Sequence, residues 1–243
     1  AATSARLVEA GVRRLLIEKP AGLTPEEVER LAALVEARGA EACVAYNRRF
    51  HASTLEAARL IAEDGGVLSF KFDFTEASRR IEALDKDPRE LAGWFFGNST
   101  HVVDLAFHLG GLPTRLVATT RDAMPWHPAG AVFVGAGETA SGAAFSYHAD
   151  WKAPGRWGVE VMTAVRRLVL QPLEELHQQT HAGFALEKVA LDDDLDRRFK
   201  PGVHRQVSAF LDGVGAERLL SLADHAEHMR LYSIIRDGGV REG

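Results

Sequence analysis

Apolar residues in the first fifty positions alternate between short continuous runs and helical spacing. The two short runs, 12–18 and 41–46, come soon after a glycine and have the length of buried strands. Helical spacing precedes each run, in 4–10 and 24–38, and Thr24-Pro25-Glu26-Glu27 is a helix-capping sequence. Helix, strand, helix, strand is the alternation of a parallel α/β layer.

From residue 51 onward the pattern changes to strand-like alternation with fewer helices. The expected helices are 53–63, 88–96, 100–109, 202–211 and 222–235, and the expected strands are 67–74, 115–120, 131–134, 143–149, 157–164 and 167–171. Residues 192–198 are expected to form a charged loop between sheet and helix. The sequence therefore predicts an α/β part, 1–50, followed by an α+β part, 51–243, with an open, mainly antiparallel sheet and flanking helices.

Composition narrows the function classes. The 243 residues are 46% hydrophobic and carry a formal net charge of -5, which disfavours nucleic acid as a partner. No apolar stretch approaches the roughly 18 residues that a membrane span needs, and the first residues do not form an export signal. Cys43 is the only cysteine, is expected to be a buried small hydrophobe, and fits a reducing, cytoplasmic setting.

Glu18-Lys19-Pro20 follows directly after Leu15-Leu16-Ile17 in the first predicted strand. Ligands of open α/β sheets collect at the carboxyl ends of strands, where a lysine can donate a hydrogen bond to a substrate hydroxyl or carbonyl. Most lysines are nevertheless solvated surface groups, so Lys19 needs a partner motif before it is assigned a role.

A candidate partner lies in the segment 97–111, which contains the predicted helix of 100–109 and ends in two glycines. At about 100° per residue, His101, Asp104 and His108 share one narrow stripe, while apolar side chains cover the remaining circumference. Such a helix is expected to be buried. Its ionisable stripe then faces either a satisfied polar network or a ligand cavity.

Taken together, these motifs resemble the Gfo/Idh/MocA dehydrogenases. Residues 15–20 resemble their Glu-Lys-Pro signature, 45–50 resemble the segment that joins their two domains, His101 and Asp104 resemble their His-x-x-Asp motif, and 199–202 with Gln206 resemble a late segment of some members. The similarity runs along the whole chain, and the first three motifs occur in the family's order.

This resemblance implies a remnant of a Rossmann domain in 1–50, which in the family binds NAD or NADP, and a substrate-binding and oligomerisation domain in 51–243. Glu18, Lys19 and Pro20 would contact the cofactor. Lys19 would also hydrogen-bond the reacting hydroxyl of a sugar, nucleotide-sugar or cyclitol, His101 would be the general acid or base, and Asp104 would orient the substrate or support the site. A homo-oligomer formed through the open sheet face is also implied.

Two departures from the family pattern keep an alternative open. Gly97 occupies a position where many members have aspartate or asparagine. No strand with a G-x-G-x-x-G turn precedes Lys19, and whether those units were lost or lie outside this sequence stays open. Residues 135–140 match G-x-G-x-x-A but are expected to form a hairpin turn, because another strand follows them. The alternative is a degenerate, cofactor-free relative that acts as a ligand-binding or assembly subunit.

Other polar and aromatic candidates are left without a role. His177 and His181 have metal-ligand spacing but are expected in an exposed turn, and we predict no metal site. Arg48 and Arg49 could bind a phosphate or a carboxylate, although arginines at such a position more often form ion pairs between domains. The four tryptophans, Trp157 among them, could stack on sugar rings but are more often core residues.

Overall fold

A computed structural model describes residues 1–242, and the first fifty of them build the layer that the sequence predicts. The elements are α1 (Ala2–Glu9), β1 (Arg14–Ile17), α2 (Pro25–Ala37) and β2 (Glu41–Val44), and the two strands are parallel. The side chain of Thr24 accepts a hydrogen bond from the backbone of Glu27, as the capping sequence predicted. A third strand, β11 (Leu220–Ser221), adds antiparallel to β2 from the far end of the chain.

The second sheet is open and mainly antiparallel. Its nine strands are β3 (Ser69–Phe74), β4 (Pro113–Arg121), β5 (Val132–Thr139), β6 (Ala144–Asp150), β7 (Trp157–Met162), β8 (Arg166–Leu170), β9 (His177–Thr180), β10 (Glu187–Lys188) and β12 (Gly239–Arg241). Their order is β10-β9-β8-β7-β3-β6-β5-β4-β12, and only β3 and β6 pair in parallel. The predicted combination of an α/β part and an α+β part is confirmed.

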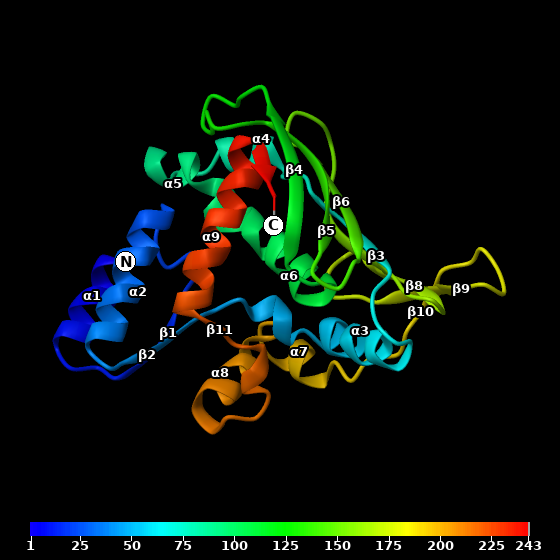
Figure 1. Ribbon diagram of the computed structural model, residues 1–243, viewed down its shortest axis with the longest axis horizontal. Helices are drawn as coiled ribbons and strands as arrows, with labels where there is room; N and C mark the ends of the chain where they lie inside the picture. Colours follow the sequence, from blue (N-terminus) through cyan, green and yellow to red (C-terminus); the bar gives the residue numbers. More distant parts are fainter. Residues whose placement is uncertain (243) are drawn as a thin grey trace.

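Helices cover one face of the large sheet and connect it to the small one (Figure 1). The elements outside the first layer are η1 (Asn47–Phe50), α3 (Ala52–Glu63), α4 (Ser78–Glu82), α5 (Pro88–Ala92), η2 (Phe95–Ser99), α6 (Thr100–Gly110), α7 (Asp194–Arg198), α8 (Val203–Asp212), η3 (Ala216–Arg218) and α9 (Leu222–Asp237). Helix α9 packs against α2 and β2 on one side and against β4 and β5 on the other.

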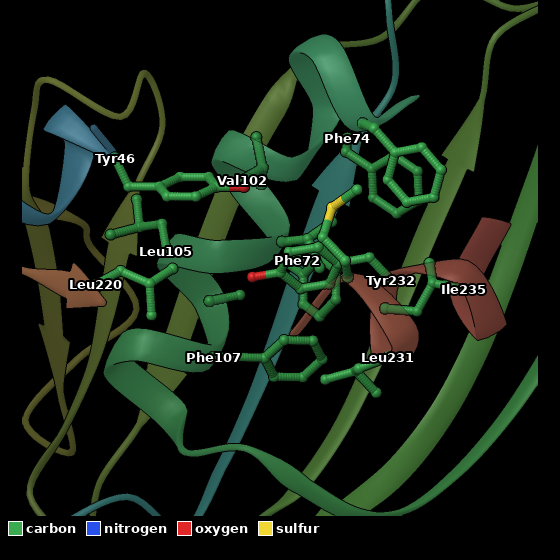
Figure 2. Close-up of a cluster of buried hydrophobic side chains, with 14 of the residues drawn as sticks. Tyr46, Phe72, Phe74, Val102, Leu105, Phe107, Leu220, Leu231, Tyr232 and Ile235 are labelled. Carbon is green, nitrogen blue, oxygen red and sulfur yellow. The ribbon is translucent and has the colours of Figure 1, made fainter. Parts of the chain in front are cut away.

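The main core lies between β3, α6 and α9. Phe72 and Phe107 pack edge to face with ring centroids 5.5 Å apart, and Leu231 and Tyr232 of α9 reach the same cluster (Figure 2). Burying so much aromatic surface on one face of the sheet stabilises the sheet and fixes α6 over it.

The structure corrects several expected boundaries. The helix expected over 88–96 ends at Ala92 and is followed by the π-helix η2, which runs straight into α6. Because η2 leads directly into α6, no side chain caps the start of α6. The expected charged loop 192–198 contains α7, since the Asp196 carboxylate accepts hydrogen bonds from the backbone of Ala52 and Gly202 and so fixes the segment. His177 lies on β9 rather than in a turn.

Residues 135–140 are not the expected hairpin turn, because β5 continues through them to Thr139. A Cβ on Gly135 would lie 2.5 Å from the ring of Tyr147, and one on Gly137 would lie 2.7 Å from that of Phe145. The two glycines are therefore needed for packing inside the sheet, where the aromatic rings of β6 cross β5.

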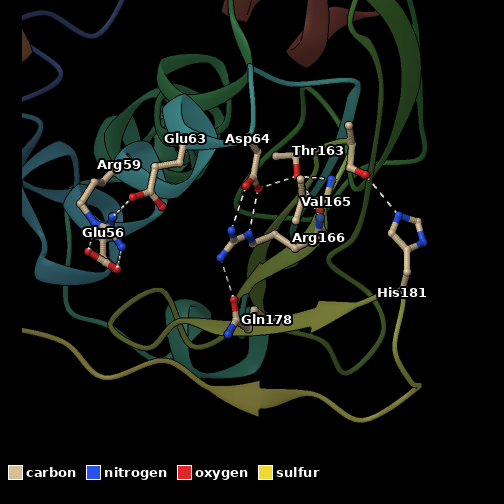
Figure 3. A network of polar contacts seen from close by, with 10 residues as sticks. Glu56, Arg59, Glu63, Asp64, Thr163, Val165, Arg166, Gln178 and His181 are labelled. Carbon is tan, nitrogen blue, oxygen red and sulfur yellow. Dashed lines mark hydrogen bonds and ion pairs between the residues drawn. The ribbon is translucent and has the colours of Figure 1, made fainter.

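A polar network joins the end of α3 to β7, β8 and β9 (Figure 3). The Arg166 guanidinium donates two hydrogen bonds of 2.8 Å to the carboxylate of Asp64, whose side chain is 3% exposed. Thr163 donates a third, of 2.7 Å, to the same carboxylate. Three charge-assisted hydrogen bonds on one shielded carboxylate make this network a fixed link between α3 and the sheet.

We expect Asp64→Ala to lower the free energy of unfolding by about 2–3 kcal/mol, because it leaves the shielded Arg166 without its partner. Urea unfolding at pH 7 measures this, with Glu63→Ala on the exposed neighbouring side chain as the matched control. Equal stability of the two variants would contradict the interpretation.

Among residues 1–242, no helix is long and apolar enough to cross a membrane. Within the same range, no three His, Cys, Asp or Glu side chains are grouped as metal ligands would be. Cys43 is half-buried rather than fully buried. The expected cytoplasmic setting stays a prediction.

Candidate functional site

Lys19 and His101 meet where the two parts of the chain join. Lys19 leaves the carboxyl end of β1 and its Nζ donates to the backbone oxygen of Gly97 in η2. His101 lies one turn further along, at the start of α6. The π-helix thus brings its carbonyl to Lys19 at the position where many Gfo/Idh/MocA members have an aspartate or asparagine side chain. The Lys19–Pro20 peptide bond is cis.

His101 is 6% exposed and lies among aromatic rings. Tyr46 packs edge to face against it with centroids 5.8 Å apart, and Trp157 lies at 6.4 Å. Burial, reinforced by the positive charges of Lys19 and Arg48, holds the pKa of His101 well below its usual value. Its imidazole is therefore neutral at pH 7 and can accept a proton.

Lys19 is half-buried, and its ammonium loses a proton at a lower pH than that of an exposed lysine. Burial, and then the positive charge of Arg48, lower the pKa of Lys19 to about 8, while the negative charges of Glu18 and Glu76 oppose this shift. An ammonium with such a pKa is charged at pH 7 and still close to giving up its proton.

Asp104 lies behind the site in a buried ion pair. Arg49 donates to its two oxygens from Nε at 2.8 Å and from Nη2 at 2.6 Å, and the Tyr232 hydroxyl donates to Oδ1 at 3.2 Å. Burial raises the pKa of Asp104, but Arg49 outweighs this and holds the pKa below its usual value. With its oxygens engaged in this way, the carboxylate is arranged to position α6 against η1 and α9. His108, on the same stripe, is half-buried.

Glu76, just after β3, is a buried carboxylate that the sequence did not single out. It accepts hydrogen bonds from the Ser99 hydroxyl at 2.7 Å and from the Asn98 amide at 3.1 and 3.2 Å. Burial raises the pKa of Glu76, while the hydrogen bonds and the charge of Lys19 act against this increase. Glu76 therefore holds η2 in place and supplies negative charge near Lys19.

A cavity of about 210 Å³ opens beside His101. Glu18, Asn47, Lys200 and Gln206 contribute its polar lining. Gln206 is 2% exposed, and its Nε2 has no hydrogen-bond partner within residues 1–242. This combination leaves hydrogen-bond donors facing a small space next to the histidine, as a polar ligand requires.

Pro20 is fixed by α9 rather than by the cavity. The Nε2 of His225 donates to the backbone oxygen of Pro20 at 2.9 Å, and burial lowers the pKa of His225 to about 4. Tyr46 packs between His225 and His101. The segment 18–20 is thereby held against α9 in one orientation.

Arg48 and Arg49 have different surroundings although they are adjacent in sequence. Arg49 is paired with Asp104, as arginines that link domains usually are. The guanidinium of Arg48 instead lies over the ring of Trp157, 5.1 Å from its centroid, and donates from Nη1 to the Asn47 side chain at 3.3 Å. Trp157 therefore connects Arg48 to His101.

The structure thus brings together Lys19, His101 and Glu18 and places Asp104 one layer behind them. Glu76 was missed, although it follows a predicted strand just as Lys19 does, and that position was the available signal. Gln206 was noted only as part of a late segment that resembles some family members, and nothing in the local sequence marks His225; both residues reach the site from the last quarter of the chain.

Fold and site define a two-part α/β scaffold with a lysine and a neutral histidine at the junction. No family model matches the sequence. An uncharacterized oxidoreductase of Schizosaccharomyces pombe is 29% identical over 110 residues, which are 44% of this chain and 30% of that protein, so the match spans under a third of the relative.

Solved structures share the fold over nearly the whole chain. Levoglucosan dehydrogenase, in complex with NADH and levoglucosan, matches 97% of this chain and 74% of its own with a TM-score of 0.75 at 20% identity. An inositol dehydrogenase homologue from Azotobacter vinelandii, in complex with NAD+, matches 100% and 75% with a TM-score of 0.73 at 18% identity. These neighbours are NAD-dependent oxidoreductases of the Gfo/Idh/MocA type, and this chain has their fold.

Proposed function

We propose that the protein is an NAD(P)-dependent oxidoreductase that interconverts a hydroxyl and a carbonyl of a sugar, nucleotide-sugar or cyclitol. The observation that carries the proposal is that the Lys19 ammonium, at the carboxyl end of β1, bonds to the backbone of Gly97 one helical turn before the neutral His101, whose pKa it lowers. A proton acceptor that lines a small polar cavity, with a cation bonded to the helix one turn before it, suits a hydroxyl that must lose its proton. The sugar and cyclitol complexes of the structural neighbours support the substrate class.

The described residues fit one end of a dinucleotide. Glu18, Lys19 and Pro20, at the carboxyl end of β1, suit the nicotinamide end, beside a hollow of about 780 Å³ that Glu18 and Pro20 line. Residues 1–242 contain no glycine-rich turn between a strand and a helix for the pyrophosphate, since the glycines at 135 and 137 lie within β5. When bound, a nicotinamide would supply the hydride acceptor.

The chain's own residues carry the proton chemistry. In the oxidation direction, Lys19 donates a hydrogen bond to the substrate oxygen and stabilises the negative charge that grows on it. His101 takes the hydroxyl proton and becomes an imidazolium, while the carbon-bound hydrogen leaves as hydride. Asp104 positions α6 through Arg49 and does not touch the substrate in this mechanism.

The test uses the protein as its gene encodes it, with any residues that precede Ala1. Calorimetric titration with NADH and NADPH should show binding. In a separate assay with NAD+ or NADP+, addition of sugars or cyclitols should reduce the cofactor, which its absorbance reports. Binding of a sugar without binding of either cofactor would favour the cofactor-free, ligand-binding alternative, which the lack of a pyrophosphate turn in 1–242 keeps in view.

We expect kcat/KM for alcohol oxidation to fall above about pH 8. The reason is that Lys19 must be charged to donate its hydrogen bond, and a cation with a lowered pKa loses its charge as the pH rises through that value. Glu76→Gln should move this fall to lower pH, because the negative charge of Glu76 raises the pKa of Lys19. Glu36→Gln, on the exposed side of α2, is the control. A profile that stays level to pH 10 would contradict this role for Lys19.

We further propose that a second copy of the chain covers the helix-free face of the large sheet. Val117 and Val134 on that face are 58% and 36% exposed. A Val117→Asp/Val134→Asp double variant should therefore elute as a monomer by light scattering, while the unaltered protein is a dimer or larger. If the unaltered protein is a monomer in the same measurement, this proposal is wrong.

A further inference from the structure

Arg48 differs from every comparable arginine in the described part of the chain. Each of the other buried or half-buried arginines contacts a carboxylate, namely Arg49, Arg166, Arg167, Arg205, Arg218 and Arg236. Arg48 is half-buried as well, yet it forms no ion pair within residues 1–242. A shielded cation without a counter-charge is energetically unfavourable. The arrangement around Arg48 therefore indicates that an anion from outside the described residues binds to it.

The unpartnered part of Arg48 is one edge of its guanidinium. Nη1 donates to Asn47, and the Trp157 ring covers one face. The buried Nε has no partner, and no hydrogen bond from Nη2 occurs within the described residues. Nε and Nη2 form the edge that binds two oxygens of a carboxylate or phosphate at once.

The charges around Arg48 favour an anion further. The positive charges of Lys19 and Lys200, like that of Arg48, lower the pKa of His101. Neither lysine forms an ion pair within 1–242. Glu174, Glu76 and Glu18 are the acids whose negative charges act on Arg48 and raise its pKa, and none of them forms an ion pair with it within residues 1–242. Three cations therefore converge on His101 without direct neutralisation.

We propose that the substrate carries an oxyanion group, a carboxylate or a phosphate, which binds to the Nε–Nη2 edge of Arg48. This inference rests on the proposed function and narrows its substrate to an acidic or phosphorylated sugar or cyclitol. Trp157, which touches both Arg48 and His101, places the oxyanion at one end of the substrate and the reacting hydroxyl at the other. Arg48 thus determines specificity, while Lys19 and His101 act on the hydroxyl.

The experiment compares matched substrates with the full-length protein and NAD+ or NADP+. Glucose, glucuronate and glucose 6-phosphate form one set, and galactose, galacturonate and galactose 6-phosphate form a second. We expect one charged class to exceed the neutral sugar in kcat/KM, mainly through a lower KM. In Arg48→Met this preference should fall about 10- to 100-fold, as loss of charge-assisted hydrogen bonds predicts. Arg48→Lys should recover part of the preference, and Arg241→Met, an exposed arginine on β12, should keep all of it.

Calorimetric binding of glucuronate and glucose 6-phosphate to the cofactor-free protein gives a second readout, and it also shows which oxyanion is preferred. Weaker binding of the acids to Arg48→Met than to Arg241→Met supports the inference, even if no sugar is turned over. The absence of turnover would count only against the proposed oxidoreductase function. A preference for neutral sugars, or equal binding of the acids to both variants, would overturn the inference and leave the proposed function standing. Thermal unfolding confirms that each variant is folded.

Discussion

His101→Ala should reduce kcat by about 10²- to 10⁴-fold, the range that a positioned general base contributes. Burial keeps the His101 imidazole neutral at pH 7, so the native side chain is ready to accept the proton. Without the imidazole, no group takes the proton from the substrate hydroxyl, although Lys19 still donates a hydrogen bond to the hydroxyl oxygen. Steady-state oxidation with a saturating sugar measures the change, and KM should move much less than kcat because the histidine acts in the transition state.

The matched control for His101 is His181→Ala, which removes an exposed histidine at the end of β9. Its kcat should equal that of the unaltered protein. Retention of kcat within about tenfold in His101→Ala would assign proton transfer elsewhere, with Lys19 as the next candidate, since the pKa of Lys19 is lowered to about 8.

Asp104→Ala should lower the free energy of unfolding by about 3–5 kcal/mol, more than Asp64→Ala does, because it leaves a buried guanidinium without its counter-charge. The side chains of Arg49 and Asp104 are 8% and 1% exposed. Urea unfolding at pH 7 gives the value. The double variant Arg49→Met/Asp104→Leu should recover much of the loss, because it removes both buried charges together.

The same pair predicts a dependence on pH. Arg49 lowers the pKa of Asp104 in the folded protein, so the pair stabilises the fold fully above the unfolded-state pKa of about 3.9. That contribution is lost as the pH falls through the lower, folded-state pKa. Asp104→Ala and the unaltered protein should therefore converge in stability under acid, and a constant difference down to pH 2 would contradict this account.

The sequence predicted those elements whose signals are local. The capping sequence at Thr24 and the apolar runs of β1 and β2 depend on neighbours in the chain, and the structure confirms them. The short strands β9 and β11 were missed because their stability comes from strands far away in the sequence. The glycines of β5 were misassigned because they are explained by the rings of β6 and, at Gly137, by the backbone oxygen of Arg115 in β4, all distant in sequence.

In the candidate site too, the residues that were predicted have local sequence signals, and most of the features that were missed depend on distant residues. Lys19 and His101 were recognised from motifs, and the structure places them together. The environment of Asp104 depends on Arg49 and Tyr232, which arrive from two other elements. The order of residue types does not show which of two adjacent arginines forms an ion pair with an acid. Arg49 forms one and has a structural role, whereas Arg48 forms none within residues 1–242 and has the proposed ligand-binding role.

The pairing of β11 with β2 has a consequence for how the molecule is made. Leu220 pairs with β2, which ends at Val44, so this part of the small sheet can form only after the chain has been synthesised as far as Leu220. Contacts so distant in sequence form late. The junction that holds Lys19 is therefore assembled after the large sheet's central strands exist, and the two parts of the protein should lose their structure in a single cooperative step.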